Sequence, residues 1–268
     1  MEVNGASYIE KHRKIAEEYT KAFKADKRVE GICYLGSIAR NYADMYSDID
    51  IAIFSEERML DLRLGEGRFK NFTVEVFNIA MNESYESWDE TQKEAYNEGI
   101  IAYDKKGDVK RFLDNALKYT NEYKTCKIIE IFFKLGWHGW AYSAYRDKQE
   151  RGYLWSLPPD LWIRRRRVEN AFYIMNMCVD MLIDLIYAIN EHWVPDIKWK
   201  WIKFSKLSWL PSSWENLSKL LVTENINKET FYEKKQIFQL LIDECYEKVV
   251  HTLPDDMYNY LIKINRAY

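Results

Sequence analysis

The sequence of 268 residues lacks a long apolar run. Its longest apolar stretch, Leu182–Ile189, is short and contains Asp184, whereas a helix that crosses a membrane needs about 20 mainly apolar residues. The opening segment, MEVNGASYIEKHRK, also lacks the apolar core that is typical of a secretory signal. We therefore expect no membrane span, no secretory signal and no membrane partner.

Cysteine and histidine are scarce, with four residues of each type. The cysteines are widely spaced and form no C-x-x-C pair, which argues against a zinc ribbon and against a redox-active dithiol. The histidines are equally dispersed and give no support to a histidine-rich metal site. Because there is no disulfide framework, we expect a reducing compartment, the cytoplasm.

An excess of positive charge is also missing. Lysine and arginine number 39 and aspartate and glutamate number 42, so the net charge is −3. Binding along a nucleic-acid backbone depends on clustered basic side chains, and the four arginines 164–167 would point to different sides of a helix. We expect no nucleic-acid partner. The hydrophobic fraction of 47% and the charged fraction of 30% are those of a soluble globular protein.

The chain divides into two parts of different pattern. Residues 1–118 alternate helix and strand signals, which predicts an α+β domain with a small mixed sheet flanked by helices. Residues 119–268 follow mainly the 3.6-residue period, which predicts an all-α helical-bundle domain. The expected strands are 31–35, 48–54, 72–79 and 99–103, with a loop around residues 65–67. The expected helices of the second part are 108–123, 125–148, 160–192, 214–221 and 228–251.

The chemically informative stretch is residues 31–54. A predicted strand runs into Gly36-Ser37, and after ten residues Asp48-Ile49-Asp50 opens the next strand. Alternation along a strand places Asp48 and Asp50 on one face, about 7 Å apart. Two carboxylates at that spacing repel each other unless a cation lies between them, and hard oxygen ligands suit Mg²⁺.

Further groups can complete this site. Glu75 stands among valines in the predicted strand 72–79, where an acid is unusual, and it can join the two aspartates if the strands are neighbours. Gly36 allows close approach of the backbone to a phosphate, and Ser37 supplies donors to the phosphate oxygens. The alternative without a functional role is that the aspartates cap a turn and that Glu75 faces solvent on an edge strand.

These residues resemble the DNA polymerase β-like nucleotidyltransferase superfamily. The matching pattern is G-S-x10-D-I-D, followed by a strand carboxylate. The Gly-Ser-x-Ala-Arg and Ser-Asp-Ile-Asp forms are most similar to small two-domain bacterial and archaeal members, such as the lincosamide and aminoglycoside nucleotidyltransferases. The resemblance implies catalytic metal ligands at Asp48, Asp50 and Glu75, two Mg²⁺ ions, and an NTP co-substrate, ATP in the first instance. Glu75 acts either as a metal ligand or as a general base for the acceptor.

Residues outside the motif carry less specific signals. Arg40 is a candidate phosphate contact, with a surface ion pair as the alternative. Lys198 is a candidate for the triphosphate, with a solvated lysine as the alternative. Tyr173, Asn176 and Asp180 lie on one stripe of a predicted helix. This stripe either binds the acceptor or is the solvent-exposed face of that helix.

The resemblance implies transfer of a nucleoside monophosphate to a hydroxyl group of a small molecule, with release of pyrophosphate. A lincosamide or an aminoglycoside antibiotic is the acceptor that the resemblance suggests, and the helical domain is expected to bind it. Two alternatives remain open, namely a protein or tRNA acceptor and a non-catalytic nucleotide-binding module. A homodimer is compatible with the resemblance, although no residue indicates one.

Overall fold

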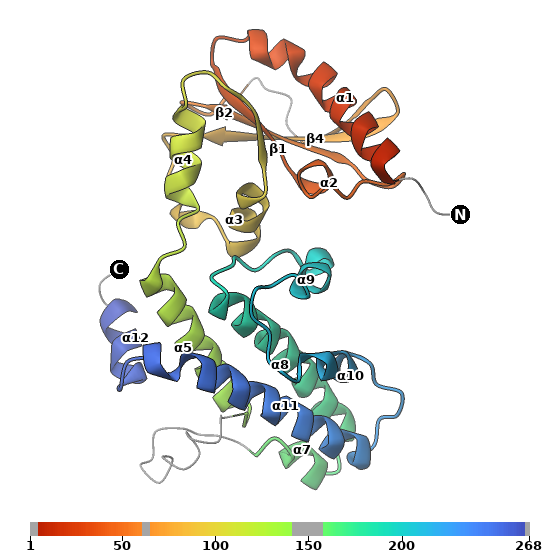
Figure 1. Cartoon of the computed structure of the whole chain (residues 1–268), viewed down its shortest axis with the longest axis vertical. Coiled ribbons are helices and arrows are strands. Elements are labelled where there is room, and N and C mark those ends of the chain that lie inside the picture. The colour runs from red at the N-terminus through yellow and green to blue at the C-terminus, as the bar shows by residue number, and fades with distance from the viewer. Residues whose placement is uncertain (1–4, 61–64, 141–157, 266–268) are drawn as a thin grey trace. The chain divides into compact units, whose positions relative to one another are not determined.

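The computed structural model describes residues 5–60, 65–140 and 158–265. The chain forms two compact units, Met1–Lys118 and Tyr119–Tyr268 (Figure 1). The first contains a mixed sheet with flanking helices, and the second is helical in its described part. This is the α+β class with a helical C-terminal region that the pattern predicts.

A five-stranded sheet forms the centre of the N-terminal unit. Its strands are β1 (Val29–Tyr34), β2 (Ile49–Ser55), β3 (Gly65–Phe69), β4 (Phe72–Ala80) and β5 (Ile100–Asp104), in the spatial order β3-β4-β2-β1-β5. β2 and β4 pair in parallel, and the other neighbouring strands pair antiparallel. The parallel pair at the centre is the one that carries the acidic residues.

The expected loop around residues 65–67 is wrong, because this stretch is the edge strand β3. β3 and β4 are joined by Lys70 and Asn71, whose φ angles of 49° and 70° are both positive. Two consecutive residues of this kind match the tight hairpin turn whose twist suits paired strands. The turn therefore allows residues 65–69 to form a strand, although the two glycines and the charged residues of this segment do not predict one.

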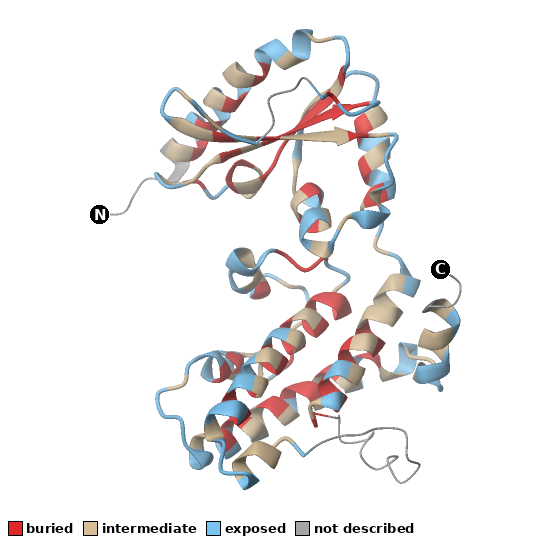
Figure 2. Ribbon diagram, turned by 180° about the vertical axis from the view of Figure 1, so that it is seen from behind, coloured by how far each residue is buried: buried red, intermediate tan, exposed pale blue. Residues whose placement is uncertain are grey.

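Helices cover both faces of the sheet. On one face α1 (Gly5–Ala25) packs Ala16 and Tyr19 against the buried isoleucines of β2. On the other face lie α3 (Glu90–Asn97) and α4 (Asp108–Ala116), which contribute Tyr96, Val109 and Leu113 to a second apolar cluster. The sheet is consequently buried on both sides, as the red positions of its strands in Figure 2 show.

The C-terminal unit is built around one long helix. Its helices are α5 (Asn121–Trp137), α7 (Leu161–Arg164), α8 (Val168–Ile189), α9 (Ile197–Phe204), α10 (Leu217–Leu221), α11 (Lys228–Val249) and α12 (Met257–Asn265). Short 3-10 turns lie at Tyr85–Ser87 in the first unit and at Trp214–Asn216 and Val250–Thr252 in the second. α8 packs against α5, α10 and α11, and its apolar side forms much of the core of this unit.

α8 differs from the expectation on membrane spans. By length and composition it is apolar enough to cross a membrane, with a mean hydropathy of 1.6 in its most apolar window. The length of the uninterrupted apolar runs does not reveal this hydropathy, because the few charges of the helix are spread along it. In the structure 61% of that window is buried within the protein, which is the environment of a core helix.

Two expected helices are divided in the structure. The expected helix 108–123 ends at Ala116, and α5 begins after Thr120, whose hydroxyl accepts a hydrogen bond from the Tyr123 N–H at 3.1 Å. The expected helix 160–192 is interrupted at Arg166, where φ is 57°. Part of the expected helix 125–148 lies outside the described residues. A capping hydroxyl and a left-handed residue set these boundaries, and the hydrophobic period does not reveal them.

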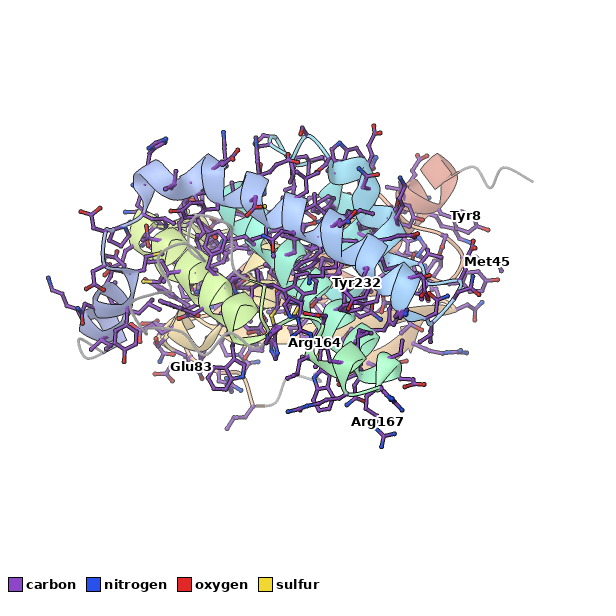
Figure 3. All side chains as sticks on the ribbon, turned by 90° about the horizontal axis from the view of Figure 1, so that it is seen from below. Tyr8, Met45, Glu83, Arg164, Arg167 and Tyr232 are labelled. Atoms are coloured by element: carbon purple, nitrogen blue, oxygen red, sulfur yellow. The ribbon has the colours of Figure 1, made fainter. Side chains whose placement is uncertain are left out.

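The arginine run at this interruption does not form one patch. Arg164 and Tyr232 lie close together in Figure 3, and both reach Asp160, with Nε at 2.8 Å and the hydroxyl at 3.5 Å. Arg165 instead lies over the Trp162 ring, 5.1 Å from its centroid. The guanidinium groups of Arg164 and Arg165 therefore have different partners.

The reactivity of the four cysteines tests how tightly the cores of the two units are packed. Burial raises the pKa of the Cys33 and Cys178 thiols to about 12, and it also raises the pKa of the fully buried Cys245. Cys126 is only partly buried. Burial and the nearby Glu122 and Glu130 also raise the pKa of the Cys126 thiol, yet it is the most accessible of the four. At pH 8 we therefore expect it alone to react promptly with Ellman's reagent in the native protein, and all four thiols to react after denaturation. Prompt reaction of two or more native thiols would contradict the described packing.

Candidate metal and nucleotide site

The first part of the site is the start of β2. Asp48 lies immediately before the strand, and Asp50 is its second residue. Ile49, Ile51 and Ile53 alternate with Asp50 and are completely buried against the α1 side. The apolar packing of these isoleucines fixes the register of the strand, so both aspartates are directed to the opposite face.

The second part of the site comes from β4. Its parallel register pairs Asp50 with Glu75 across the two strands. One carboxylate oxygen from each of Asp48, Asp50 and Glu75 lies within 4.8 Å of the other two. All three side chains remain accessible to solvent. Three converging carboxylates at this distance form a donor set that can hold a divalent cation such as Mg²⁺.

Gly36 brings the backbone against this acidic cluster. It follows β1 and has φ of 53°, a conformation that side chains other than glycine rarely adopt. A methyl group at this position would overlap the Oδ2 atom of Asp50. The Leu35 N–H also donates to the Asp50 carbonyl at 3.0 Å. Both the conformation and the space therefore require glycine here.

Ser37 is placed beside Asp48. Its buried hydroxyl donates to the Asp48 carbonyl at 3.0 Å. The helix α2 (Gly36–Ala39) that begins here is a single turn. In this structure the serine thus orders the backbone of an acidic residue, while its role toward a phosphate stays a prediction.

Arg40 contacts two glutamates of the α3 region. Its Nη2 atom lies 2.6 Å from Glu94, and its Nε atom lies 3.0 Å from Glu98, both in or at the end of α3. The side chains of Arg40 and Glu94 are only 8% and 7% exposed. The arginine therefore ties α2 to α3, and the predicted phosphate contact stays a prediction.

The remaining predicted residues belong to the helical unit. Tyr173, Asn176 and Asp180 all lie on the exposed side of α8, and Tyr173 is 69% exposed. Lys198 is exposed in the first turn of α9, which Asp196 caps by accepting the Lys198 N–H at 3.1 Å. Their roles in binding the acceptor or the nucleotide stay predictions.

Asp180 also has a structural partner. Lys200 of α9 lies 2.7 Å from Asp180 and 2.8 Å from Asp184 of α8. Burial raises the pKa of the Asp184 carboxyl, and the Lys200 ammonium opposes that shift. The Tyr187 hydroxyl donates to the Lys200 carbonyl at 2.7 Å. These contacts fasten α9 to α8, so part of the acidic stripe holds two helices together.

One acidic residue near the site was missed from the sequence. Glu66 pairs with Glu75 across the β3–β4 ladder, so Asp50, Glu75 and Glu66 form a row over three adjacent strands. Glu66 is exposed and is not part of the cluster of three. Its position depends on β3, which was expected to be a loop.

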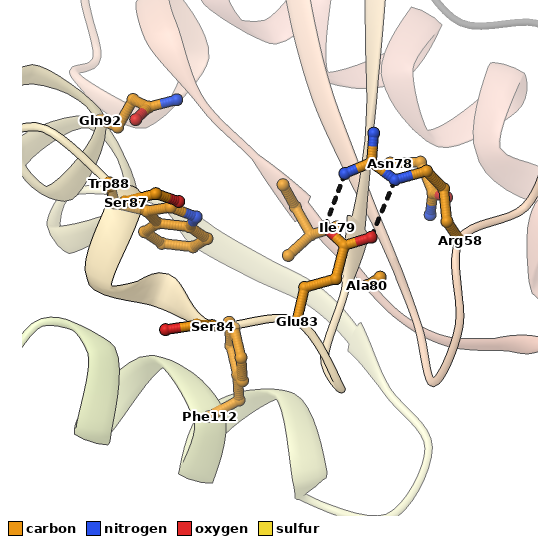
Figure 4. Close-up of a pocket in the computed structure, with 10 residues that line it drawn as sticks. All are labelled: Arg58, Asn78, Ile79, Ala80, Glu83, Ser84, Ser87, Trp88, Gln92 and Phe112. Carbon is orange, nitrogen blue, oxygen red and sulfur yellow. Dashed lines mark hydrogen bonds and ion pairs between the residues drawn. The ribbon is translucent and has the colours of Figure 1, made fainter.

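A pocket of about 250 Å³ lies elsewhere in the same unit (Figure 4). Ile79, Trp88 and Phe112 line it together with the Arg58–Glu83 ion pair. Ile79 is four residues beyond Glu75 on β4, which corresponds to about 13 Å along a strand. The pocket shares no lining residue with the acidic cluster and is separate from it.

The arrangement defines an enzyme class. A Gly-Ser turn after one strand faces two aspartates and a third carboxylate on the neighbouring strands, as in enzymes that transfer nucleotides. Residues 10–120 match the nucleotidyltransferase domain family. Residues 10–120 thus form a nucleotidyltransferase domain of the DNA polymerase β-like superfamily, which supports a transferase of EC 2.7.7 type.

The structural comparison supports the same fold. The nucleotidyltransferase-like protein from Exiguobacterium sibiricum 255-15 has a TM-score of 0.50 and 12% sequence identity to this chain. The alignment covers 95% of this chain and 80% of that protein. At this identity the likeness concerns the fold alone. No curated protein matches the sequence significantly.

The Arg40 ion pair predicts a loss of stability. Replacing Arg40 with leucine leaves the Glu94 carboxylate buried without its arginine, so we expect the free energy of unfolding to fall by about 3 kcal/mol. Urea denaturation measures it. The matched control is Arg58→Leu, which removes an exposed partner of Glu83 and should leave stability nearly unchanged. Equal effects of the two substitutions would contradict the buried pair.

Gly36 predicts a loss of the site. Gly36→Ala combines backbone strain with overlap on Asp50, so we expect it to abolish Mn²⁺ binding measured by calorimetry. Gly107→Ala is the control, because Gly107 has φ of 78° and open space around it. The control should cost about 1 kcal/mol of stability through strain alone and retain Mn²⁺ binding. Wild-type affinity in Gly36→Ala would show that the turn does not press on Asp50.

Proposed function

We propose that this chain transfers a nucleoside monophosphate, AMP from ATP, to a hydroxyl group of a small molecule in a Mg²⁺-dependent reaction. The observation that carries the proposal is the convergence of Asp48, Asp50 and Glu75 within 4.8 Å beside the Gly36-Ser37 turn. The family assigned to residues 10–120 implies a nucleoside triphosphate and a divalent metal.

The balanced reaction is a substitution at the α-phosphorus. The acceptor oxygen forms a bond to that phosphorus, the bond to the bridging oxygen of the β-phosphate breaks, and pyrophosphate leaves. The acceptor proton passes to a base or to solvent. Most of the rate enhancement is expected from positioning and from stabilisation of negative charge.

Each residue has a proposed part in this reaction. Asp48 and Asp50 hold the metal, and Glu75, which is paired with Asp50 in the sheet, completes the ligand set. A bound divalent cation supplies a Lewis acid for the phosphate and acceptor oxygens. The backbone around Gly36 and Ser37 binds phosphate oxygens. The close placement of Glu75 beside Asp50 favours its role as a ligand over that of a separate base.

The acceptor is proposed to bind the helical unit. The exposed stripe offers the ring of Tyr173 and the amide of Asn176 to a polar molecule, next to the Asp180 carboxylate that also pairs with Lys200. The net charge of −3 favours a small acceptor over tRNA. Lincosamide and aminoglycoside antibiotics are the first compounds to test, because the motif is most similar to enzymes that modify them.

The test is a transfer assay with α-labelled nucleoside triphosphates, Mg²⁺ and a panel of lincosamides, aminoglycosides, total tRNA and cell protein. We expect label on one small acceptor and a loss of at least about a hundredfold in Asp50→Asn, since a charged group at the reacting phosphate is removed. Asp114→Asn, an exposed aspartate of α4 that pairs with Lys110, is the matched control and should retain activity. Label on tRNA or protein alone would overturn the proposed acceptor. The absence of triphosphate binding would overturn the proposed reaction.

A further inference from the structure

His12 is a buried residue of α1. Each of its two ring nitrogens faces a carbonyl oxygen. The residue is 1% exposed. Nδ1 lies 2.7 Å from the Tyr8 carbonyl one turn earlier in the helix, and Nε2 lies 3.1 Å from the Ser47 carbonyl. Carbonyl oxygens only accept, so each contact is a hydrogen bond when the ring nitrogen that faces it carries a hydrogen.

The same ring touches both segments that lead to the acidic cluster. Ser47 directly precedes Asp48. Phe72, the first residue of β4 and three residues before Glu75, packs edge-to-face against His12 with ring centroids 5.0 Å apart. One buried imidazole from α1 therefore contacts the backbone beside one carboxylate and the strand that carries another.

Asp48 needs such support because it lies outside the sheet. β2 begins at Ile49, so the ladder hydrogen bonds that order Asp50 do not include Asp48. The Ser37 hydroxyl donates to the Asp48 carbonyl, and the Nε2 atom of His12 lies 3.1 Å from the carbonyl immediately before it. The preceding turn is ordered by Asp44, which accepts from the Tyr46 N–H at 2.8 Å and from the Ser47 hydroxyl at 3.0 Å.

We propose that His12 is a positioning residue of the metal site, which fixes Asp48 through the Ser47 carbonyl and sets the start of β4 through Phe72. The inference rests on the proposed metal-dependent function. His12 touches neither the metal ligands nor substrate in this arrangement, and it acts through the backbone. Partners that orient metal ligands typically change metal affinity about tenfold or more when they are removed.

Two substitutions separate the contacts of this ring. The amide nitrogen of His12→Asn reaches about as far as Nδ1 and can keep the bond to Tyr8, but it cannot reach Ser47. The longer His12→Gln places its amide nitrogen about where Nε2 lies and can restore the bond to Ser47. Both substitutions remove the ring from Phe72, so they share the packing loss and differ in the Ser47 contact.

The experiment measures Mn²⁺ affinity by calorimetry on the full chain, with Mn²⁺ as the probe for the site, together with urea denaturation of each variant. We expect Mn²⁺ affinity to fall about tenfold in His12→Asn and to recover by at least about threefold in His12→Gln. Thr20→Val is the control on the same helix, because the buried Thr20 hydroxyl bonds to Ala16 and Tyr34 and not to the segments before Asp48 and Glu75. It should bind Mn²⁺ like the wild type.

The outcomes distinguish this inference from the function on which it rests. Unchanged Mn²⁺ affinity in His12→Asn, or equal losses in His12→Asn and His12→Gln, would overturn the role of the Ser47 contact. A loss in Thr20→Val as large as that in His12→Asn would make the effect one of helix packing and would also overturn it. If the wild type does not bind Mn²⁺ at all, the proposed metal-dependent function fails, and the inference fails with it.

Discussion

Repulsion between carboxylates is the constraint on which this N-terminal unit depends. The parallel pairing of β2 and β4 places Asp50 beside Glu75, and Asp48 joins them within 4.8 Å. Such a cluster opposes folding until a cation is bound, so the rest of the unit must hold the strands in place. Buried isoleucines on one face of the sheet and the second apolar cluster on the other face keep the strands in place.

The same constraint explains the tight surroundings of the cluster. Gly36 leaves no room for a side chain against Asp50, a serine hydroxyl donates to the Asp48 carbonyl, and a buried imidazole lies against the carbonyl before it. Beyond them, the buried Arg40–Glu94 pair joins α2 to α3. Flexible acidic residues could relax their repulsion by moving apart, whereas here the surrounding contacts oppose such movement.

Much of this arrangement can be predicted from local sequence. The strands around residues 31–35, 48–54, 72–79 and 99–103 follow from alternation and β-rich composition, and G-S-x10-D-I-D with Glu75 marks the acidic cluster. β3 could not be predicted, because a turn at Lys70 and Asn71 creates it. The partners of Arg40 and His12 are 54 and 35 residues away in sequence, so their contacts depend on the folded arrangement. The identity of the acceptor cannot be predicted from the fold either, because related folds bind many different substrates.

The edge position of β3 has a consequence for the behaviour of the protein in solution. An edge strand exposes backbone groups that a second chain can use to extend the sheet. β3 is only five residues long, carries Glu66 and Arg68 as exposed charges, and contains two glycines that weaken strand pairing. A strand of this composition is a poor template for a neighbouring molecule. The hairpin that completes the sheet thus also gives it an edge that is poorly suited to pairing with another chain.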